Sequence, residues 1–286
     1  MATLRDIRRR INSVKNTQTI TRAMQMVAAA KLRRAQESIE KARPYAEKIS
    51  DVVSSLVGCI EDPSFHPLLA KREERRVDIV VITADRGLCG AFNINVMEKA
   101  EKFARDKNLS CDDVKLTCIG TKAVTYFRRR GFNIRAAYRD RMSKFQFKDA
   151  VVIAEDLIKE FERAEVDRIY IFFNYFKSVG VQLPVTEVFL PVESPEKVES
   201  VVDYIYEPSA GIILNSILPR YTIFKLYRSM LESAAAEQAA RMNAMEKATS
   251  NCRDMLERLT LLYHKERQAS ITKEMIDIVS GAEAVK

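Results

Sequence analysis

The sequence predicts an α+β protein in which the N- and C-terminal helices form a long antiparallel coiled coil beside a central Rossmann-like α/β domain. Near each end of the chain, apolar residues recur in alternating steps of three and four, which is the spacing of a coiled-coil seam. Between these ends, β-branched runs of strand length alternate with helical stretches. That order is typical of a sheet covered by helices.

The N-terminal helix is predicted to span residues 1–58. Thr3 suits its N-cap, because Asp6 follows three positions later in the arrangement of a capping box. Residues 59–76 contain two prolines and a run of charges, so we expect them to form a linker.

The seam of this helix is predicted in two phases. A short apolar series ends at Val14, and after a polar run we expect the stripe to resume in a new phase through Ile20, Met24 and Val27. Pro44 falls within the later part and is expected to bend the helix or break its hydrogen bonding locally. The later seam consists of Leu32, Ala35, Ile39, Ala42, Ala46, Ile49, Val53 and Leu56.

The α/β domain is predicted over residues 77–190. Its strands are expected at 77–83, 114–119, 166–176 and 181–190, and its helices after the first strand to about Lys107, at 121–130 and at 147–164. The last two strands are joined near Gly180, as in a hairpin.

Residues 191–208 are predicted to be a linker with a short strand, followed by a C-terminal helix at 209–286. A helix from about 209 to 284 would measure roughly 110 Å at 1.5 Å per residue. Its seam is Met245, Ala248, Cys252, Met255, Leu259 and Leu262. Beyond Arg267 and Gln268 the apolar stripe resumes in a new phase, and an unpaired apolar helix tip calls for a partner.

Composition excludes several classes of protein. The 286 residues are 30% charged and 47% hydrophobic, and no run of eighteen apolar residues could form a transmembrane helix. Five cysteines without a CxxC pair fit a reducing cytosol. The two histidines lie far apart in the sequence, so no metal site, catalytic triad or cofactor is predicted.

Positive charge is concentrated at the N-terminus. Residues 1–43 hold eleven Lys and Arg against three acidic residues, a net charge of +8 that equals the charge of the whole chain. The N-terminal helix is therefore suited to an acidic partner surface or to a polyanion.

The segment Thr83 to Gly90 follows a strand and precedes a helix, where a phosphate-binding loop lies in a Rossmann-type fold. It matches neither GxGxxG nor GxxxxGK[ST]. We interpret it as a tight turn that needs Gly87 and Gly90, with Cys89 as a packing residue.

Several blocks of the sequence resemble the γ subunit of bacterial F-type ATP synthase over essentially the full length. They are residues 7–11, 16–31, 85–90, 204–208, 237–242, 267–272 and 278–282. Since the resemblance begins at residue 7, no cleaved organelle presequence is expected.

The resemblance implies a rotor shaft without a catalytic site of its own. In this family the terminal helices turn inside a ring of three α and β subunit pairs, while the α/β domain lies beside ε on the c-ring. Proton flow through the membrane ring drives conformational cycling of the catalytic sites, so ATP synthesis or hydrolysis is coupled to ion transport. The implied location is the cytoplasmic face of the bacterial inner membrane, as a peripheral protein.

The resemblance also assigns contact residues by position. Contacts with the β subunit are implied for Arg9, Arg10, Arg22, Met24, Arg267, Gln268, Thr272 and Glu274. A hydrophobic bearing tip is implied for Ile271, Met275, Ile278 and Val279. Contacts with the c-ring or ε are implied for Asp85, Arg86, Gly87, Tyr204, Tyr206 and Glu207. The sequence departs from the family pattern at His264 and Cys252, where relatives often carry Asn and a small residue.

Two alternatives remain open at the level of sequence. A nucleotide-dependent α/β enzyme with coiled-coil arms would bind nucleotide as the purified chain. A basic coiled-coil protein that binds nucleic acid would show steep, salt-dependent DNA binding.

Overall fold

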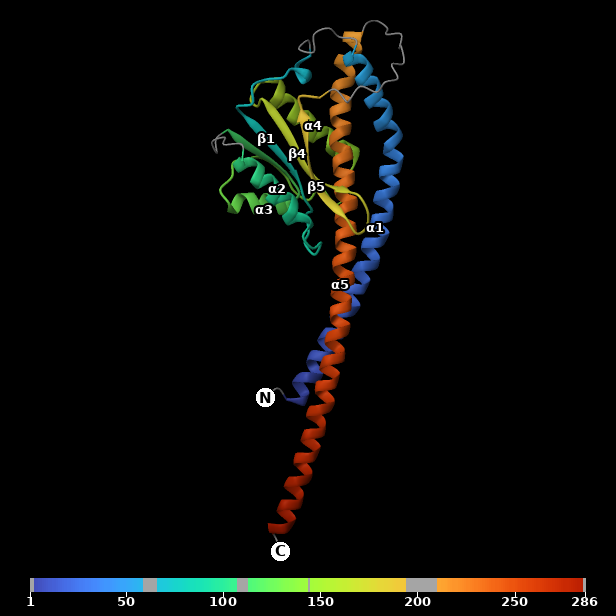
Figure 1. Cartoon of the computed structure of the whole chain (residues 1–286), viewed down its shortest axis with the longest axis vertical. Helices are drawn as coiled ribbons and strands as arrows, with labels where there is room; N and C mark the ends of the chain where they lie inside the picture. Colours follow the sequence, from blue (N-terminus) through green and yellow to red (C-terminus); the bar gives the residue numbers. More distant parts are fainter. Residues whose placement is uncertain (1–2, 59–65, 107–112, 144, 194–209, 285–286) are drawn as a thin grey trace. The chain divides into compact units, whose positions relative to one another are not determined.

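The computed structural model describes residues 3–58, 66–106, 113–143, 145–193 and 210–284. The chain divides by packing into two units: a body at residues 29–241, and a terminal helix pair at residues 1–28 with 242–286. Two long helices, α1 (Leu4–Gly58) and α5 (Ala210–Ala284), contribute to both units (Figure 1). Each is continuous through its internal proline, Pro44 in α1 and Pro219 in α5.

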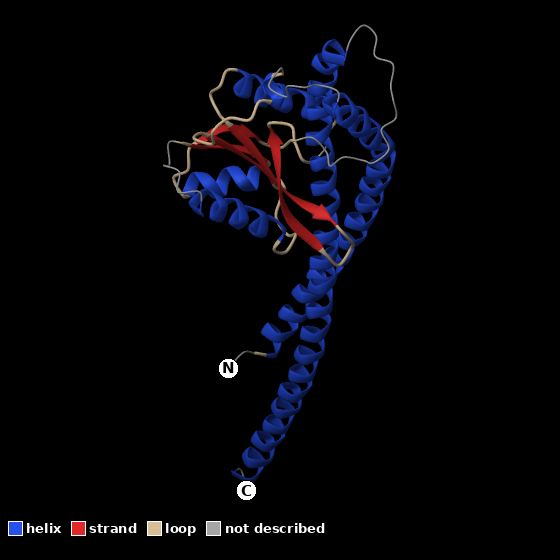
Figure 2. Cartoon of the chain, turned by 45° about the horizontal axis from the view of Figure 1, so that its top comes forward, coloured by secondary structure: helices blue, strands red, loops and turns tan. Residues whose placement is uncertain are grey.

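The body contains one five-stranded sheet in the order β3-β2-β1-β4-β5 (Figure 2). Strands β1 (Val77–Ile82), β2 (Val114–Ile119), β3 (Ile134–Tyr138) and β4 (Arg168–Phe176) are parallel, and β5 (Gln182–Leu190) pairs with β4 in antiparallel orientation. Since β2 and β4 flank β1, the connections run in opposite directions from that strand, as in Rossmann-type sheets.

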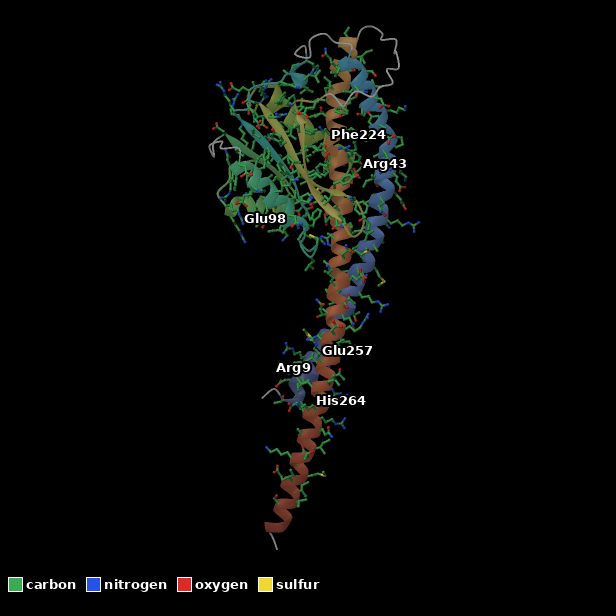
Figure 3. The ribbon with its side chains drawn as sticks, viewed as in Figure 1. Arg9, Arg43, Glu98, Phe224, Glu257 and His264 are labelled. Atoms are coloured by element: carbon green, nitrogen blue, oxygen red, sulfur yellow. The ribbon has the colours of Figure 1, made fainter. Side chains whose placement is uncertain are left out.

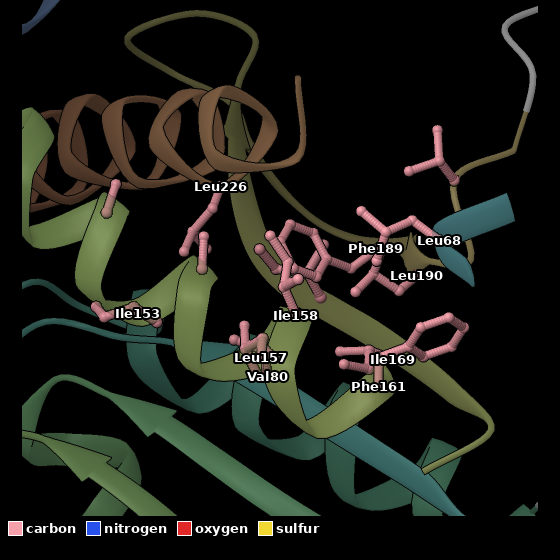
Figure 4. Packing of buried hydrophobic residues seen from close by; sticks show 14 of the residues in the cluster. Leu68, Val80, Ile153, Leu157, Ile158, Phe161, Ile169, Phe189, Leu190 and Leu226 are labelled. Carbon is pink, nitrogen blue, oxygen red and sulfur yellow. The ribbon is translucent and has the colours of Figure 1, made fainter. Parts of the chain in front are cut away.

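Helices cover both faces of this sheet. Helices α2 (Phe92–Asp106) and α3 (Thr121–Arg129) pack on one face through residues such as Val96 and Phe127. Helix α4 (Phe147–Glu162) and parts of α1 and α5 pack on the other face. Figure 4 shows this second core, where Leu157 of α4 and Leu226 of α5 lie against the sheet.

The predicted seam of α1 within the body is confirmed, since every one of its eight positions is buried or partly buried. Leu32 packs against Ala235 and Ala239 of α5. Near Ala42 and Ala46 the seam is under-filled. A cavity of about 320 Å³ lies there between the two helices of the body.

The fold class is confirmed, but two elements were missed. Strand β3 was not predicted, and its residues are mostly half-buried. Within the predicted linker, Pro67–Leu69 form the 3-10 helix η2, and Leu68 and Leu69 enter the core. The linker at 59–65 and the predicted short strand before α5 lie outside the described residues.

In the terminal helix pair, the predicted phase change in α1 is wrong. The buried stripe keeps one heptad phase through Ile7, Val14, Thr21 and Ala28, whereas Ile20 is 60% exposed. The hydroxyl oxygens of Thr21 and Thr249 lie 2.8 Å apart, so a hydrogen bond joins the two helices at a polar position. The heptad spacing of the seam continues through Thr21 because two packed helices keep the same repeat even where a seam residue is polar.

The C-terminal seam is also shifted from its prediction at two positions. Met255 and Leu262 are 45% and 42% exposed, and their neighbours Leu256 and Tyr263 lie partly buried in their place. The predicted N-cap is confirmed: the backbone N–H of Asp6 donates to Thr3 Oγ1 at 3.3 Å, and the backbone N–H of Thr3 donates to Asp6 Oδ2 at 3.1 Å.

Candidate functional site

The carboxyl edge of the sheet is where a Rossmann-type fold would hold a nucleotide, and here it is filled by the chain's own groups. Asp85 Oδ1 accepts a hydrogen bond from the backbone N–H of Thr121 at 3.1 Å, at the first residue of α3. Its Oδ2 accepts from the backbone N–H of Ser143 at 3.1 Å. A helix N-terminus favours an anion, and at α3 the carboxylate of Asp85 takes the position that a phosphate would need.

Helix α5 fills the neighbouring position, between the ends of β1 and β4. Ala236 of α5 packs in a cluster with Ala84, Cys89 and Phe92. Burial raises the pKa of the Cys89 thiol, which disfavours the nucleophilic thiolate. Its role as a packing residue therefore agrees with its surroundings.

The predicted foot contacts divide into two groups. Asp85 uses both carboxylate oxygens inside the body, whereas Arg86 is exposed and Gly87 is half-buried. Tyr204, Tyr206 and Glu207 lie outside the described residues.

The predicted β-subunit contacts in α1 lie mainly on the surface of the helix pair. Arg9, Arg10 and Arg22 are exposed, and Met24 is partly buried at the edge of the seam. Arg9 is labelled in Figure 3. Because they are exposed, the arginines are free to meet an acidic surface.

Sequence reasoning missed an apolar surface on the same helix. Ile20, Met26 and Val27 are 60%, 62% and 56% exposed. Ile20 and Val27 are seven residues apart, so they lie on one stripe of the helix. The signal was available in the sequence, because the strict heptad that contains Ile7, Val14 and Ala28 leaves these residues outside the seam.

The C-terminal part of α5 is exposed on all sides. Arg267 and Gln268 are exposed, and every residue from Ile271 to Gly281 is exposed. Thr272 Oγ1 donates to the backbone carbonyl of Gln268 at 2.9 Å, and Ser270 Oγ donates to Glu274 Oε1 at 3.2 Å, so both interactions stay within the helix. The exposed fractions of the predicted tip residues are 48% for Ile271, 59% for Met275, 70% for Ile278 and 60% for Val279.

Neither a metal-binding cluster nor a membrane-spanning helix occurs among the described residues. Within residues 3–58, 66–106, 113–143, 145–193 and 210–284, no group of three or more His, Cys, Asp and Glu side chains could hold a metal ion. Across the same residues, no helix is both long and apolar enough to span a bilayer.

Comparison with known proteins identifies the family. A family model described as ATP synthase matches residues 3–285. A protein of Syntrophobacter fumaroxidans called ATP synthase gamma chain is 45% identical, with 100% of each chain covered. The chain belongs to the ATP synthase gamma chain family. A protein of the same name from Desulforamulus reducens is 47% identical, again over 100% of each chain.

Solved structures show the same fold. A chain from the central stalk and c-ring of Tetrahymena thermophila mitochondrial ATP synthase has a TM-score of 0.61 and 25% identity, and the match covers 80% of this chain and 99% of that chain. A chain from the Euglena gracilis mitochondrial enzyme has a TM-score of 0.70 and 18% identity, covering 99% and 94%.

The structure explains why two of the family-like sequence blocks occur together. The block at 85–90 forms the loop after β1, and the block at 237–242 belongs to the part of α5 that packs near this loop. Arg241 Nη2 donates to the backbone carbonyl of Gly87 at 3.2 Å. The two blocks are thus joined by direct contact within the chain.

Proposed function

We propose that this chain is the central rotor shaft of an F-type ATP synthase. The observation that carries the proposal is the long helix α5, which is held by the body through its first half and exposes apolar side chains on all sides from Ile271 onward. A helix with this surface needs a surrounding partner, because exposed apolar area of this extent is unfavourable in water. Full-length similarity to ATP synthase gamma chains supports the same role.

The partners follow from that role. The shaft lies inside a ring of three α and three β subunits, and its foot contacts ε and the c-ring. Support for this arrangement comes from the Tetrahymena neighbour, which is a central stalk chain solved with its c-ring. The chain is a non-catalytic subunit, and it joins the membrane only through the complex, on the cytoplasmic face.

The proposed mechanism is a population shift driven by unequal contacts. Each face of a turning shaft stabilises one β-subunit conformation over the others, so rotation moves the three catalytic sites through different states. The ring supplies about 2.3 kcal/mol per charge for each 100 mV of membrane potential. The shaft must therefore transmit torque without yielding.

Contacts with the β subunit are assigned to two surfaces. On α1 they are Arg9, Arg10, Arg22 and Met24, to which the exposed stripe of Ile20 and Val27 adds apolar area. On α5 they are Arg267, Gln268, Thr272 and Glu274. Arginine is suited to bidentate pairing with carboxylates, which accounts for the basic character of the first surface.

The remaining contacts are assigned to the two ends of the shaft. Ile271, Met275, Ile278 and Val279 form the bearing tip, where non-directional apolar contact permits turning. The foot contacts with ε or the c-ring are assigned to Asp85, Arg86, Gly87, Tyr204, Tyr206 and Glu207. Asp85 holds the loop from inside the body through Thr121 and Ser143.

Reconstitution tests the function directly. The chain is mixed with α and β subunits, and the mass and ATPase activity of the product are measured. An active complex that holds one copy of this chain among three α and β pairs supports the proposal. A well-folded chain that does not join the ring, but binds nucleotide or DNA, would replace it with one of the two alternatives.

A single variant tests the assigned contact at Arg267. We expect Arg267→Ala to lower ATPase activity or assembly several-fold, because a charge-assisted contact with a β loop is lost. The matched control is Arg253→Ala, another exposed arginine on the same helix. Equal activity and assembly in both variants would remove Arg267 from the contact surface.

A further inference from the structure

Glu237 and Arg241, one helical turn apart on α5, form an ion pair inside the body. Their side chains are only 10% and 13% exposed. Arg241 Nη1 donates to Glu237 Oε1, and Arg241 Nη2 donates to the backbone carbonyl of Gly87 at 3.2 Å. One guanidinium therefore connects α5 to the loop that follows β1, and the assigned shaft contacts make no use of it.

The loop that accepts this hydrogen bond is itself held in place. Asn93 Oδ1 accepts from the backbone N–H of Ala84 at 2.9 Å, and Asn93 Nδ2 donates to Cys89 Sγ at 3.1 Å. Leu88 has a φ of 63°, which an L-residue adopts only when its surroundings hold it there. The Gly87 carbonyl is therefore presented to Arg241 by a fixed loop.

Near Glu237 and Arg241, α5 has few large side chains that could interlock with the rest of the body. Its sequence contains Ala234, Ala235, Ala236, Ala239 and Ala240. Small residues allow close approach, but apolar contact is non-directional and resists rotation of a helix about its axis only through the interlocking of side chains. A hydrogen bond, in contrast, weakens steeply when its donor turns away from its acceptor.

We propose that Glu237, Arg241 and the Gly87 carbonyl form a latch that prevents α5 from turning within the body, so that torque applied to the body reaches the C-terminal half of the helix. The inference rests on the proposed function as a rotor shaft. It makes Glu237 and Arg241 positioning residues, which act through the orientation of α5 and touch no reacting group.

Other polar contacts between α5 and the sheet lie farther from the C-terminal end of the body. The backbone N–H of Phe176 in β4 donates to Glu232 Oε2 at 3.2 Å, and Glu232 precedes Arg241 by more than two helical turns. Arg228 pairs with Glu187 of β5 at 3.1 Å, but their side chains are 46% and 32% exposed. Exposed pairs are screened by solvent and contribute little. Lys225 Nζ donates to the Val188 carbonyl at 2.6 Å, four turns before Arg241. The latch is the last polar tie along α5 in the described part of the body.

The latch is a device for orientation and contributes little to stability. Burial raises the pKa of Glu237, although Arg241 beside it acts in the opposite direction. The net direction means that burial, together with the nearby Asp85 carboxylate, outweighs the effect of Arg241 and Lys31 on the Glu237 carboxylate. Apolar residues of similar size are often neutral or stabilising in place of such a pair, whereas removal of one partner leaves a buried charge.

The test therefore uses a double variant, Glu237→Leu with Arg241→Met, which removes the directional contacts and keeps the volume. Its matched control is Glu187→Gln with Arg228→Gln, which removes the exposed pair. Both are assembled with α and β subunits and the membrane sector in vesicles, and ATPase rate and proton pumping are measured. We expect the latch variant to keep its ATPase rate within about twofold while pumping per ATP falls by about fivefold, within the range of typical coupling effects.

Pumping per ATP equal to that of the control variant would overturn the latch. Hydrogen exchange on the isolated full chain tests the contact independently of assembly, and we expect faster exchange at residues 85–91 and 236–241 in the latch variant. Unchanged exchange there would overturn the inference even if pumping per ATP falls. Failure of the unmodified chain to assemble and pump would instead count against the proposed function, and the exchange experiment would still decide whether the contact exists.

Discussion

The body and the terminal helix pair use the same two helices but bury them differently. Within the body, α5 is buried on several sides, and eight of the eleven residues from Ser229 to Ala239 are buried. Among residues 242–281, whose burial the structure describes, Met245 is the one buried residue of α5, and the other seam residues are partly exposed. One helix is thus a core element in one unit and a surface for partners in the other.

The difference shows how a single helix can be both anchored and available for binding. The sheet, α4 and α1 pack against α5 in the body, so the position of α5 depends on several neighbouring elements. In the helix pair, α5 packs against α1 alone, through a single stripe of residues. Burial is concentrated in the body, and exposed surface lies on the helix pair, where we propose that the ring is contacted.

The largest expected effect is a cavity in the body. Leu157 of α4 is completely buried, and Leu157→Ala should lower the free energy of unfolding by about 2–5 kcal/mol, because transfer and cavity terms add. Urea unfolding followed by circular dichroism measures this change. Ile7→Ala, at a buried position in the helix pair, should leave the unfolding midpoint of the body unchanged and raise hydrogen exchange only in the first turns of α1.

If Ile7→Ala shifted the body midpoint as much as Leu157→Ala, the two units would unfold together. The contrast drawn between them would then be wrong.

The same contrast explains what the sequence could and could not predict. The predicted C-terminal helix corresponds to α5, because its apolar residues recur at helical spacing, although the seam was shifted at Met255 and Leu262. Strand β3 was missed because Arg135, Ala136 and Ala137 give an edge strand little β-branched character. The position of β3 depends on its pairing with β2, and the sequence of β3 alone does not predict that pairing.

The site residues were predictable only in part. The heptad phase of α1 was misread because Thr21 is polar but buried and Ile20 is apolar but exposed, which reverses the usual preference. The Arg241 contact with Gly87 was invisible, since it joins residues 154 positions apart. Local sequence patterns predict the helices and most strands, but contacts between residues far apart in the sequence can be identified only from the folded structure.

The second prediction concerns the pH dependence of the body. Arg135 Nε lies 3.1 Å from Asp78 Oδ2 and 3.0 Å from Glu160 Oε2, so two buried carboxylates share one guanidinium. Lys115 Nζ also lies 3.1 Å from Glu160 Oε1. Burial, and then the Asp78 carboxylate, raise the pKa of Glu160 from 4.5 to about 7.

The sign follows from proton binding. Since the folded pKa of Glu160 is raised, the folded state keeps a proton that the unfolded state releases, and this stabilisation is complete below pH 4.5 and lost as pH rises through about 7. Glu160→Gln should therefore flatten the fall in unfolding free energy between these values. Glu155→Gln, an exposed position on the same helix, is the control. An unchanged pH profile in Glu160→Gln would show that another group is responsible.

A third prediction uses the under-filled seam in the body. Ala42 and Ala46 border the cavity of about 320 Å³ between α1 and α5. Phe224, which is labelled in Figure 3, lines it from α5. Ala46→Leu should raise the free energy of unfolding by about 1 kcal/mol, because it buries added methylene groups without removing existing contacts. Thermal unfolding measures the change, and Ala30→Leu at an exposed position of α1 is the control. Destabilisation by Ala46→Leu would mean that the cavity cannot accept the side chain.

The smallest effect is expected at the polar position in the helix pair. Thr21 Oγ1 and Thr249 Oγ1 lie 2.8 Å apart, and each is also within hydrogen-bond distance of a carbonyl of its own helix, Gln18 O at 3.0 Å and Met245 O at 2.8 Å. Because each hydroxyl keeps that local acceptor when the other is removed, a single Thr→Val change should cost only about 0.5–1 kcal/mol.

A double-mutant cycle isolates the contact across the helices. Thr21→Val and Thr249→Val together should restore most of the stability lost by either change alone, since an apolar pair replaces a polar pair of similar shape. Hydrogen exchange within residues 14–28 and 242–256 is the appropriate measurement, because a global unfolding curve reports mainly on the body. If the two losses simply add, the hydroxyls do not interact, and the helix pair is then held by its apolar seam alone, with no polar layer to fix how the two helices meet.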